Sequence, residues 1–114
     1  MREIKAFFRA QKTEAITDAL DNLGVVDYTV IFVMGIGEHL SDTSESSYSI
    51  EVVKKYSNIA KLELVCKSER VPEITRVLRE VAYTGTKGDG IIYVTPVEKA
   101  IKIRTGAVDS DALK

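Results

Sequence analysis

Two stretches of the chain alternate apolar and polar residues with the period of a half-buried strand. In residues 2–9, Ile4, Ala6 and Phe8 fall on one face, and polar residues dominate the other. In residues 59–66, the alternate positions that share an apolar face are Ala60, Leu62, Leu64 and Cys66. The pattern therefore predicts two strands, each with one face toward a core.

Two other stretches place apolar residues at helical spacing. The first helix is expected to begin at Thr13 as its N-cap and to end at Gly24, which can adopt the left-handed conformation. Its apolar stripe is Ile16, Ala19, Leu20 and Leu23. The second helix is expected to begin at Ser68 as its N-cap, with Pro72 in the first turn. Its stripe is Val71, Ile74, Val77, Leu78 and Val81.

Residues 25–34 form the most β-prone run, and they are apolar on both faces. Such a strand is typical of the centre of a sheet that is covered on both sides. A single helical layer can cover only one face of the sheet. The pattern therefore predicts a partner on the other face, which is the first indication of an oligomer.

The remaining segments are either more polar or have only short apolar runs. Residues 38–57 are rich in hydroxyl groups and are expected to form a mobile loop, which is either functional or a tolerated insertion. Residues 91–94 predict a strand, and 97–104 predict a further edge strand. Residues 107–114 form a polar, acidic tail that is expected to fray.

The order of these elements is strand, helix, strand, loop, strand, helix and strand. This order predicts an α+β, ferredoxin-like βαββαβ fold, in which two helices cover one face of an antiparallel sheet. With 114 residues, the chain is expected to form one domain over residues 1–114.

Composition narrows the range of functions. The net charge is −1, which argues against nucleic-acid binding. No stretch approaches the roughly 20 apolar residues that span a bilayer. One cysteine and one histidine leave no intramolecular disulfide and no Cys/His zinc site, and they fit a cytoplasmic protein. Because no catalytic constellation can be placed in one site, we expect no enzyme, no metal site and no redox cofactor.

Three glycines punctuate residues 84–90, just before the strand at 91–94. Consecutive N–H groups in such a turn can form a nest for phosphate, which Lys102 and Arg104 could then help to hold. The alternative is a helix C-cap followed by a turn that binds nothing. The local sequence leaves both interpretations open.

Several motifs, taken together, resemble those of a known protein family. Residues 84–90 with 92–94 and 101–106, together with 18–24, 28–30 and 35–37, resemble the PII nitrogen-regulatory signal proteins. The resemblance covers nearly the whole chain except about residues 38–57, and it is that of a divergent, PII-like member.

The resemblance implies a homotrimer whose sheets form an inner barrel and whose subunit clefts bind adenine nucleotides. It also implies a regulator that docks on a protein partner, such as a membrane transporter or a metabolic enzyme, through the loop at 38–57. The positions that match the family's nucleotide site are Phe7, Tyr28, Thr29, Gly35, Ile36, Gly37, Glu63, Val65, Lys87, Gly88, Asp89, Gly90, Lys102 and Arg104.

The chain also departs from the family pattern. Ile91 stands where the family has a lysine, and Glu38 and His39 stand where it has Arg-Gln. Fewer cations predict that ADP or AMP is favoured over ATP, and the lost glutamine argues against 2-oxoglutarate and leaves Mg²⁺ undecided. Bicarbonate is a candidate effector instead. The alternative function is a scaffold trimer that binds a small anion or a protein without nucleotide signalling.

Overall fold

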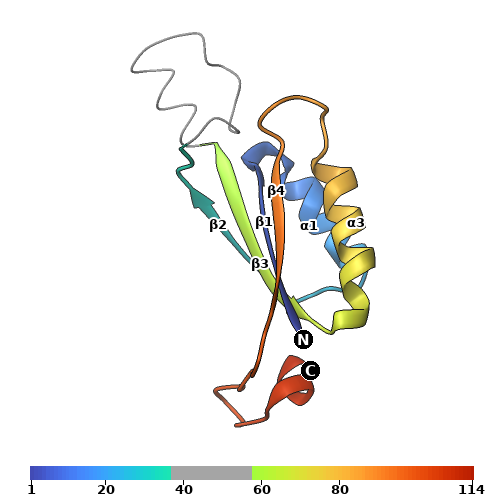
Figure 1. Ribbon diagram of the computed structural model, residues 1–114, viewed down its shortest axis with the longest axis vertical. Coiled ribbons are helices and arrows are strands. Elements are labelled where there is room, and N and C mark those ends of the chain that lie inside the picture. The colour runs from blue at the N-terminus through green and yellow to red at the C-terminus, as the bar shows by residue number, and fades with distance from the viewer. Residues whose placement is uncertain (37–57) are drawn as a thin grey trace.

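The computed structural model describes residues 1–36 and 58–114, so Gly37 and the predicted loop at 38–57 lie outside the described residues. Figure 1 shows a four-stranded antiparallel sheet with two helices packed on one face, which confirms the predicted fold class. The sheet order is β2-β3-β1-β4. The elements are β1 (Arg2–Arg9), α1 (Thr13–Asn22), β2 (Thr29–Val33), β3 (Ile59–Cys66), α3 (Val71–Ala82) and β4 (Gly90–Pro96).

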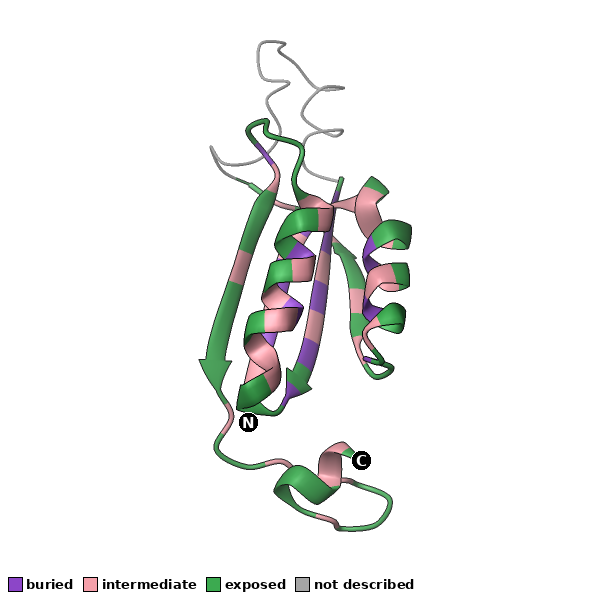
Figure 2. Ribbon diagram, turned by 90° about the vertical axis from the view of Figure 1, so that its right-hand side faces the viewer, coloured by how far each residue is buried: buried purple, intermediate pink, exposed green. Residues whose placement is uncertain are grey.

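The core lies between the helices and the sheet, as the alternation predicts. Antiparallel pairing sets Ile4 opposite Leu64 and Ala6 opposite Leu62, so the apolar positions of β1 and β3 share the face toward the helices. Figure 2 shows the buried positions on the inner sides of the helices and strands. The largest fully buried side chains are Phe8, Ile4, Ile16, Leu20, Leu62, Ile74 and Leu78. Each contributes about 1.5–3 kcal/mol through burial.

Both helices begin differently from the prediction, because a turn of 3₁₀ helix precedes each one. Thr13 is the first residue of α1, and its hydroxyl donates to the carbonyl of Ala10 at 2.6 Å. Ser68 begins the 3₁₀ turn Ser68–Arg70, and α3 starts at Val71. The assignment of these two residues as N-caps was therefore wrong. At the other end of α1, Gly24 has φ +79°, as its predicted left-handed role requires.

The apolar run at 25–34 forms a shorter strand than predicted, and the strand is not central. Within residues 1–36 and 58–114, β2 pairs only with β3 and forms one edge of the sheet. Phe32 is 65% exposed and Met34 is 68% exposed. A strand that is apolar on both faces is expected to be buried on both faces. The pattern does not indicate whether the residues that bury it belong to the same chain or to another copy.

The C-terminal segment also differs from the prediction of an edge strand and a frayed tail. After β4 the chain leaves the sheet and folds back on itself, with a bridge between Ile101 and Val108 (Figure 1). The N–H groups of Lys102 and Gly106 close this turn with two hydrogen bonds of 2.8 Å. Residues Asp109–Leu113 then form a 3₁₀ helix. Backbone pairing therefore orders a segment whose composition alone indicated fraying.

Gly90 is where β4 begins, and it lies against the backbone of β1. Its φ is +112°, and a Cβ placed on it would lie 1.8 Å from the carbonyl oxygen of Phe7. The Phe7 carbonyl cannot move away from this Cβ without breaking the pairing of Phe8 with Gly90. The position therefore accepts only glycine, independently of any ligand.

We expect the Gly90→Ala substitution to lower the free energy of unfolding by about 3 kcal/mol or more, because it combines a strained φ with a backbone clash. Gly24→Ala is the matched control, since Gly24 has φ +79° but open space around it. Its cost should be about 1–2 kcal/mol. Urea unfolding followed by circular dichroism measures both, and equal costs would contradict the close approach at Gly90.

Candidate functional site

The glycine-rich turn at residues 84–90 joins α3 to β4. Gly85, Gly88 and Gly90 all have positive φ, at +86°, +102° and +112°. The turn therefore uses the conformational freedom that its three glycines predict.

An internal anion occupies part of this turn. The carboxylate of Asp89 accepts hydrogen bonds from the backbone N–H groups of Thr84 and Gly85, at 2.8 and 2.9 Å, and from the Thr84 hydroxyl. The N–H groups of Lys87 and Gly88 make no hydrogen bond with the residues that the structure describes. The nest that the sequence predicts is thus partly filled by the chain's own side chain.

Arg9 fastens the turn to the end of β1. Its Nε donates to Asp89 at 3.3 Å, and its Nη2 donates to the Thr86 hydroxyl at 2.9 Å and to the Lys87 carbonyl at 2.8 Å. Arg9 lies on the more polar face of the strand predicted at residues 2–9, and its sequence position alone indicates no such role. The missing information was the strand pairing: Phe8 lies opposite Gly90, and this brings Arg9 next to the turn.

These bonds set the charge state of Asp89. Hydrogen bonds from the Thr84 hydroxyl and then from the Thr84 backbone N–H hold the pKa of the Asp89 carboxyl well below its usual range, and Arg9 adds to the effect. Asp89 is therefore ionised at neutral pH. The Arg9 side chain is 15% exposed, so the pair is partly shielded from solvent.

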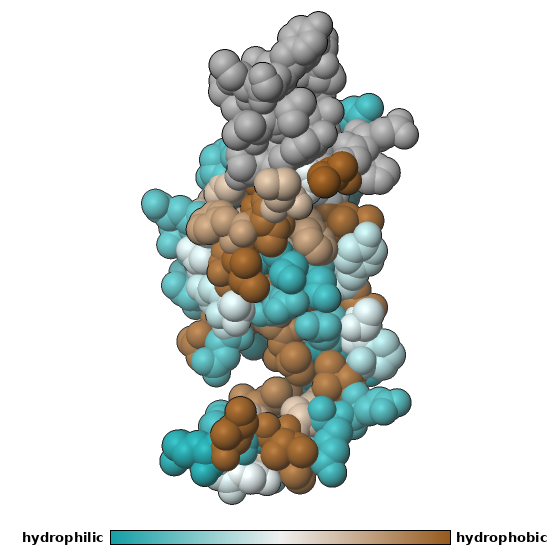
Figure 3. All heavy atoms as spheres, turned by 90° about the vertical axis from the view of Figure 1, so that its left-hand side faces the viewer, coloured by the Kyte–Doolittle hydropathy of each residue, from teal (hydrophilic) through white to brown (hydrophobic). Residues whose placement is uncertain are grey.

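A cavity of about 530 Å³ lies on the open face of the sheet, beside the turn. It brings together four of the predicted site residues, and Ile91 also faces it. Figure 3 shows apolar side chains gathered on this face near the end where the turn lies, above a polar middle. The predicted residues in its lining are Phe7, Gly35, Ile36 and Gly90. Lys61 belongs to the same lining.

A second group of predicted residues lies from the middle of the sheet toward its other end. Thr29 pairs with Glu63, and the Glu63 carboxylate lies 3.7 Å from the ammonium of Lys5 and 3.6 Å from that of Lys61. Val65 is 37% exposed on the same face. Tyr28 points toward α1 instead, where its hydroxyl donates to Asp21 at 3.1 Å. Burial and the neighbouring Asp21 raise the Tyr28 pKa.

Lys102 and Arg104 lie in the C-terminal segment, beyond the end of the sheet that is opposite the glycine turn (Figure 1). The Lys102 ammonium donates to the carbonyl of Lys114 at 2.7 Å. One copy of the chain therefore does not bring these two cations to the turn. The structure therefore places the glycine turn at one end of the sheet and these two cations beyond the other end, with Thr29, Glu63 and Val65 between them.

Comparison with known proteins identifies the protein family to which the chain belongs. The model of the family described as "Nitrogen regulatory protein P-II" matches residues 1–107. A nifHD-region GlnB-like protein 1 of Methanobacterium ivanovii is 37% identical over 92% of this chain and 95% of its own. Nitrogen regulatory proteins P-II of Synechocystis and Azospirillum brasilense are 34% and 33% identical, each over 99% of this chain and all of its own. The chain belongs to the P-II family, which confirms the resemblance.

Two further findings concern residues 1–36 and 58–114. None of their helices has the length and apolar character needed to cross a membrane. Their cysteine and carboxylate side chains form no group of three or more that could hold a metal ion.

The lowered pKa of Asp89 predicts a pH dependence. The native state keeps this carboxylate charged at a lower pH than the unfolded chain does, so its contribution to stability is complete above the unfolded pKa of about 4. The contribution is lost as the pH falls below that value. We expect Asp89→Asn to lower the melting temperature at neutral pH, and the gap from the wild type to shrink as the pH falls from about 5 to about 2.

Thermal unfolding followed by circular dichroism across this range measures the gap. Asp18→Asn is the control, because Asp18 lies exposed on α1. A gap between wild type and Asp89→Asn that stays constant with pH would show that Asp89 is not the group responsible.

Proposed function

We propose that the chain forms a homotrimeric, PII-like signalling protein that binds an adenine nucleotide in the clefts between its copies. The observation that supports this is the separation of Lys102 and Arg104 from the glycine turn, which lie at opposite ends of one sheet. Two copies are needed to bring such groups into one site. A cavity of about 530 Å³ at one group is large enough for a small organic ligand.

In this proposal, one copy supplies the apolar wall and the glycine turn. Phe7, Ile36 and the backbone at Gly35 receive the base and sugar, with Gly37 continuing the wall. The phosphates lie at the turn formed by Lys87, Gly88, Asp89 and Gly90. There the N–H groups of Lys87 and Gly88 are available as donors, and the Lys87 ammonium adds charge.

The neighbouring copy supplies the other wall and two cations. Thr29, Glu63 and Val65 face the base from its open sheet, and Tyr28 borders them. Lys102 and Arg104 bind the phosphates, with Arg104 able to use a bidentate geometry that Lys102 lacks. Lys102 would exchange its bond to the Lys114 carbonyl for a phosphate oxygen.

The trimer is supported by the apolar surface that one copy leaves open. Among the strands of residues 1–36 and 58–114, β2 lies at an edge. On the open face of the sheet, Ile31, Ile91 and Tyr93 are 43%, 51% and 50% exposed. In the ordered C-terminal segment, Ile103 is 100% exposed. Contacts of this face and this segment with other copies would bury these side chains.

Shorter nucleotides are the preferred ligands in this proposal. Asp89 already uses the N–H groups of Thr84 and Gly85, and Ile91 brings no charge to the site. The site therefore offers fewer donors to a third phosphate, which favours ADP or AMP over ATP. Mg²⁺ is not required for this preference.

The signalling part of the proposal concerns the loop at 38–57, which lies outside the described residues. We propose that nucleotide changes how this loop engages a protein partner, such as a transporter that would recruit the protein from the cytoplasm to a membrane, or a metabolic enzyme. Glu38 and His39 replace the residues that favour 2-oxoglutarate, which argues against that effector. Bicarbonate is the candidate second effector in this proposal, as the resemblance to a divergent, PII-like member suggests. In this proposal the protein acts by controlling a partner, as a regulator and not as an enzyme.

One observation favours the alternative of a scaffold trimer that binds a small anion or protein without nucleotide signalling. Because Asp89 fills part of the glycine turn, the turn is stable without any phosphate. Such a trimer would keep its assembly in the absence of nucleotide binding.

Calorimetric titration with AMP, ADP and ATP tests the nucleotide site. We expect ADP or AMP to bind at least as tightly as ATP, and Arg104→Gln to weaken ADP binding by about tenfold or more, because it removes charge-assisted hydrogen bonds. Arg76→Gln is the control, since Arg76 is exposed on α3 and pairs only with Glu80 within the described residues. A strict preference for ATP would contradict the proposed selectivity, and a trimer that binds no nucleotide would favour the scaffold.

Mixing two variants tests whether each site combines residues of two copies. Ile36→Asp disrupts the cavity, and Arg104→Gln disrupts the cation group, so trimers of either variant alone should bind ADP weakly. When the two are unfolded and refolded together, some sites pair two intact groups, and part of the tight binding should return. Sedimentation measures the trimer, and no recovery in mixed trimers would mean that one copy holds the whole site.

A further inference from the structure

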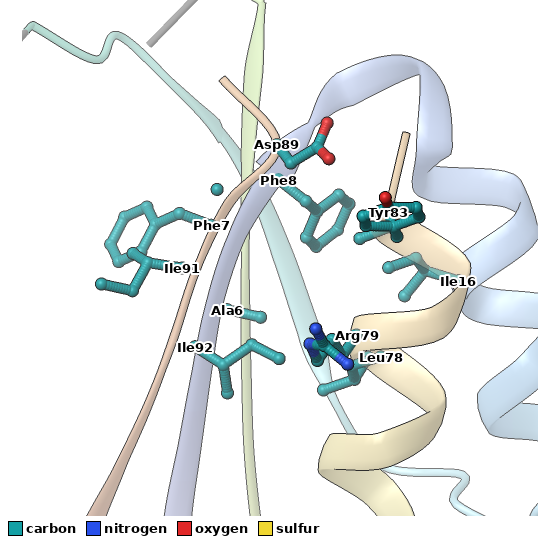
Figure 4. Close-up of a pocket in the computed structure, with 12 residues that line it drawn as sticks. Ala6, Phe7, Phe8, Ile16, Leu78, Arg79, Tyr83, Asp89, Ile91 and Ile92 are labelled. Carbon is teal, nitrogen blue, oxygen red and sulfur yellow. The ribbon is translucent and has the colours of Figure 1, made fainter. Parts of the chain in front are cut away.

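The glycine turn and one wall of the open-face cavity are both attached to the same end of β1. Phe7 lines that cavity, and its carbonyl lies against Gly90. Figure 4 shows Phe7 and Ile91 directed toward one side of the sheet, while Asp89 lies just before β4 with its carboxylate directed toward the side of α3. Arg9 follows Phe7 by two residues in β1 and binds the turn.

Arg9 holds the turn at three points. Its guanidinium group donates to the Asp89 carboxylate, the Thr86 hydroxyl and the Lys87 carbonyl. Among the described residues, no other side chain from outside residues 84–90 makes a hydrogen bond with the turn. Arg9 is therefore the side chain that sets the position of the turn relative to β1.

The bond to the Lys87 carbonyl also orients the next backbone N–H group. The peptide bond between Lys87 and Gly88 is trans, so the Lys87 carbonyl and the Gly88 N–H point in opposite directions across one rigid plane. Because the carbonyl points toward the Arg9 guanidinium at 2.8 Å, the Gly88 N–H points away from it.

This N–H group has no acceptor among the residues that the structure describes. Gly88 is buried, and a buried N–H group without an acceptor costs free energy that an acceptor oxygen would recover. The turn therefore presents a donor that Arg9 orients from behind and that no described residue uses.

We propose that Arg9 is a positioning residue for the phosphate of the nucleotide. It does not contact the nucleotide, and it fixes the turn so that the Gly88 N–H donates to a phosphate oxygen. This inference rests on the proposed function, because it concerns the same site. Without Arg9, the turn would have to be ordered at the moment of binding, which lowers affinity. The wall at Phe7 would be unaffected, so the loss is confined to the phosphate.

Calorimetric titration with ADP and adenosine tests this role, since adenosine has the same base and sugar without phosphate. Arg9→Gln should weaken ADP by about tenfold, because preorganisation of the turn is lost, and should leave adenosine within about twofold. Arg9→Lys keeps the charge beside Asp89 without the three bonds, and it should weaken ADP by about threefold. It also tests the proposal if Arg9→Gln does not fold.

Arg2→Gln is the matched control, because Arg2 lies at the other end of β1 and donates to the Met1 carbonyl. It should bind both ligands as the wild type does. Equal weakening of ADP and adenosine in Arg9→Gln would show a merely structural role and would overturn the proposal. Unchanged ADP binding in Arg9→Gln would overturn it as well, and the proposed nucleotide site would still stand.

Hydrogen exchange of single amides, measured by NMR, tests the Gly88 donor directly. Without ligand, the Gly88 amide should exchange faster than the Thr84 amide, which donates to Asp89 at 2.8 Å. ADP should slow the exchange of Gly88 in the wild type and not in Arg9→Gln. Equal protection of Gly88 and Thr84 without ligand would mean that Gly88 already has an acceptor, and this would overturn the proposal.

Inorganic pyrophosphate separates this inference from the proposed function. If the wild type binds no ADP but binds pyrophosphate, and Arg9→Gln weakens pyrophosphate, the nucleotide function fails and the role of Arg9 stands. If the wild type binds neither ligand, both proposals are wrong.

Discussion

The contact between Gly90 and the Phe7 carbonyl is the constraint on which the rest of this region depends. It sets the start of β4 directly against β1, and it places Asp89 within reach of Arg9. Phe7 and Gly90 also line the cavity on the open face of the sheet. Gly90 resembles part of a phosphate-binding loop, but the close pairing of β4 with β1 already requires a glycine at this position. Any ligand at the turn would bind to a backbone whose shape this pairing sets.

The glycine turn is held by contacts within a single chain, whereas the proposed nucleotide site needs residues of two copies. Asp89 and Arg9 satisfy the turn internally, so it holds its shape without a ligand. The cations Lys102 and Arg104 stand at the far end of the sheet, on an ordered segment that leaves the body of the chain. Membership of the P-II family and this separation together favour a site that only assembly completes.

Much of the candidate site could be named from the sequence, but its contacts could not. The glycine positions and their positive φ follow from composition and spacing. The role of Arg9 depends on which residue lies opposite Gly90, and that is a matter of strand register. The Asp89 carboxylate could equally have faced solvent. Its position depends on hydrogen bonds to backbone groups that converge only when the turn is folded.

The sequence by itself determined the two strand faces, the two helical stripes and their assembly into a βαββαβ fold, because burial follows the periods of strand and helix. Only the tertiary structure decided that β2 lies at an edge among the described strands, that each helix begins after a 3₁₀ turn, and that the tail is ordered. These features depend on which backbone groups pair across the fold. Periodicity records how much apolar surface a segment must bury, whereas pairing between distant segments decides where that surface lies.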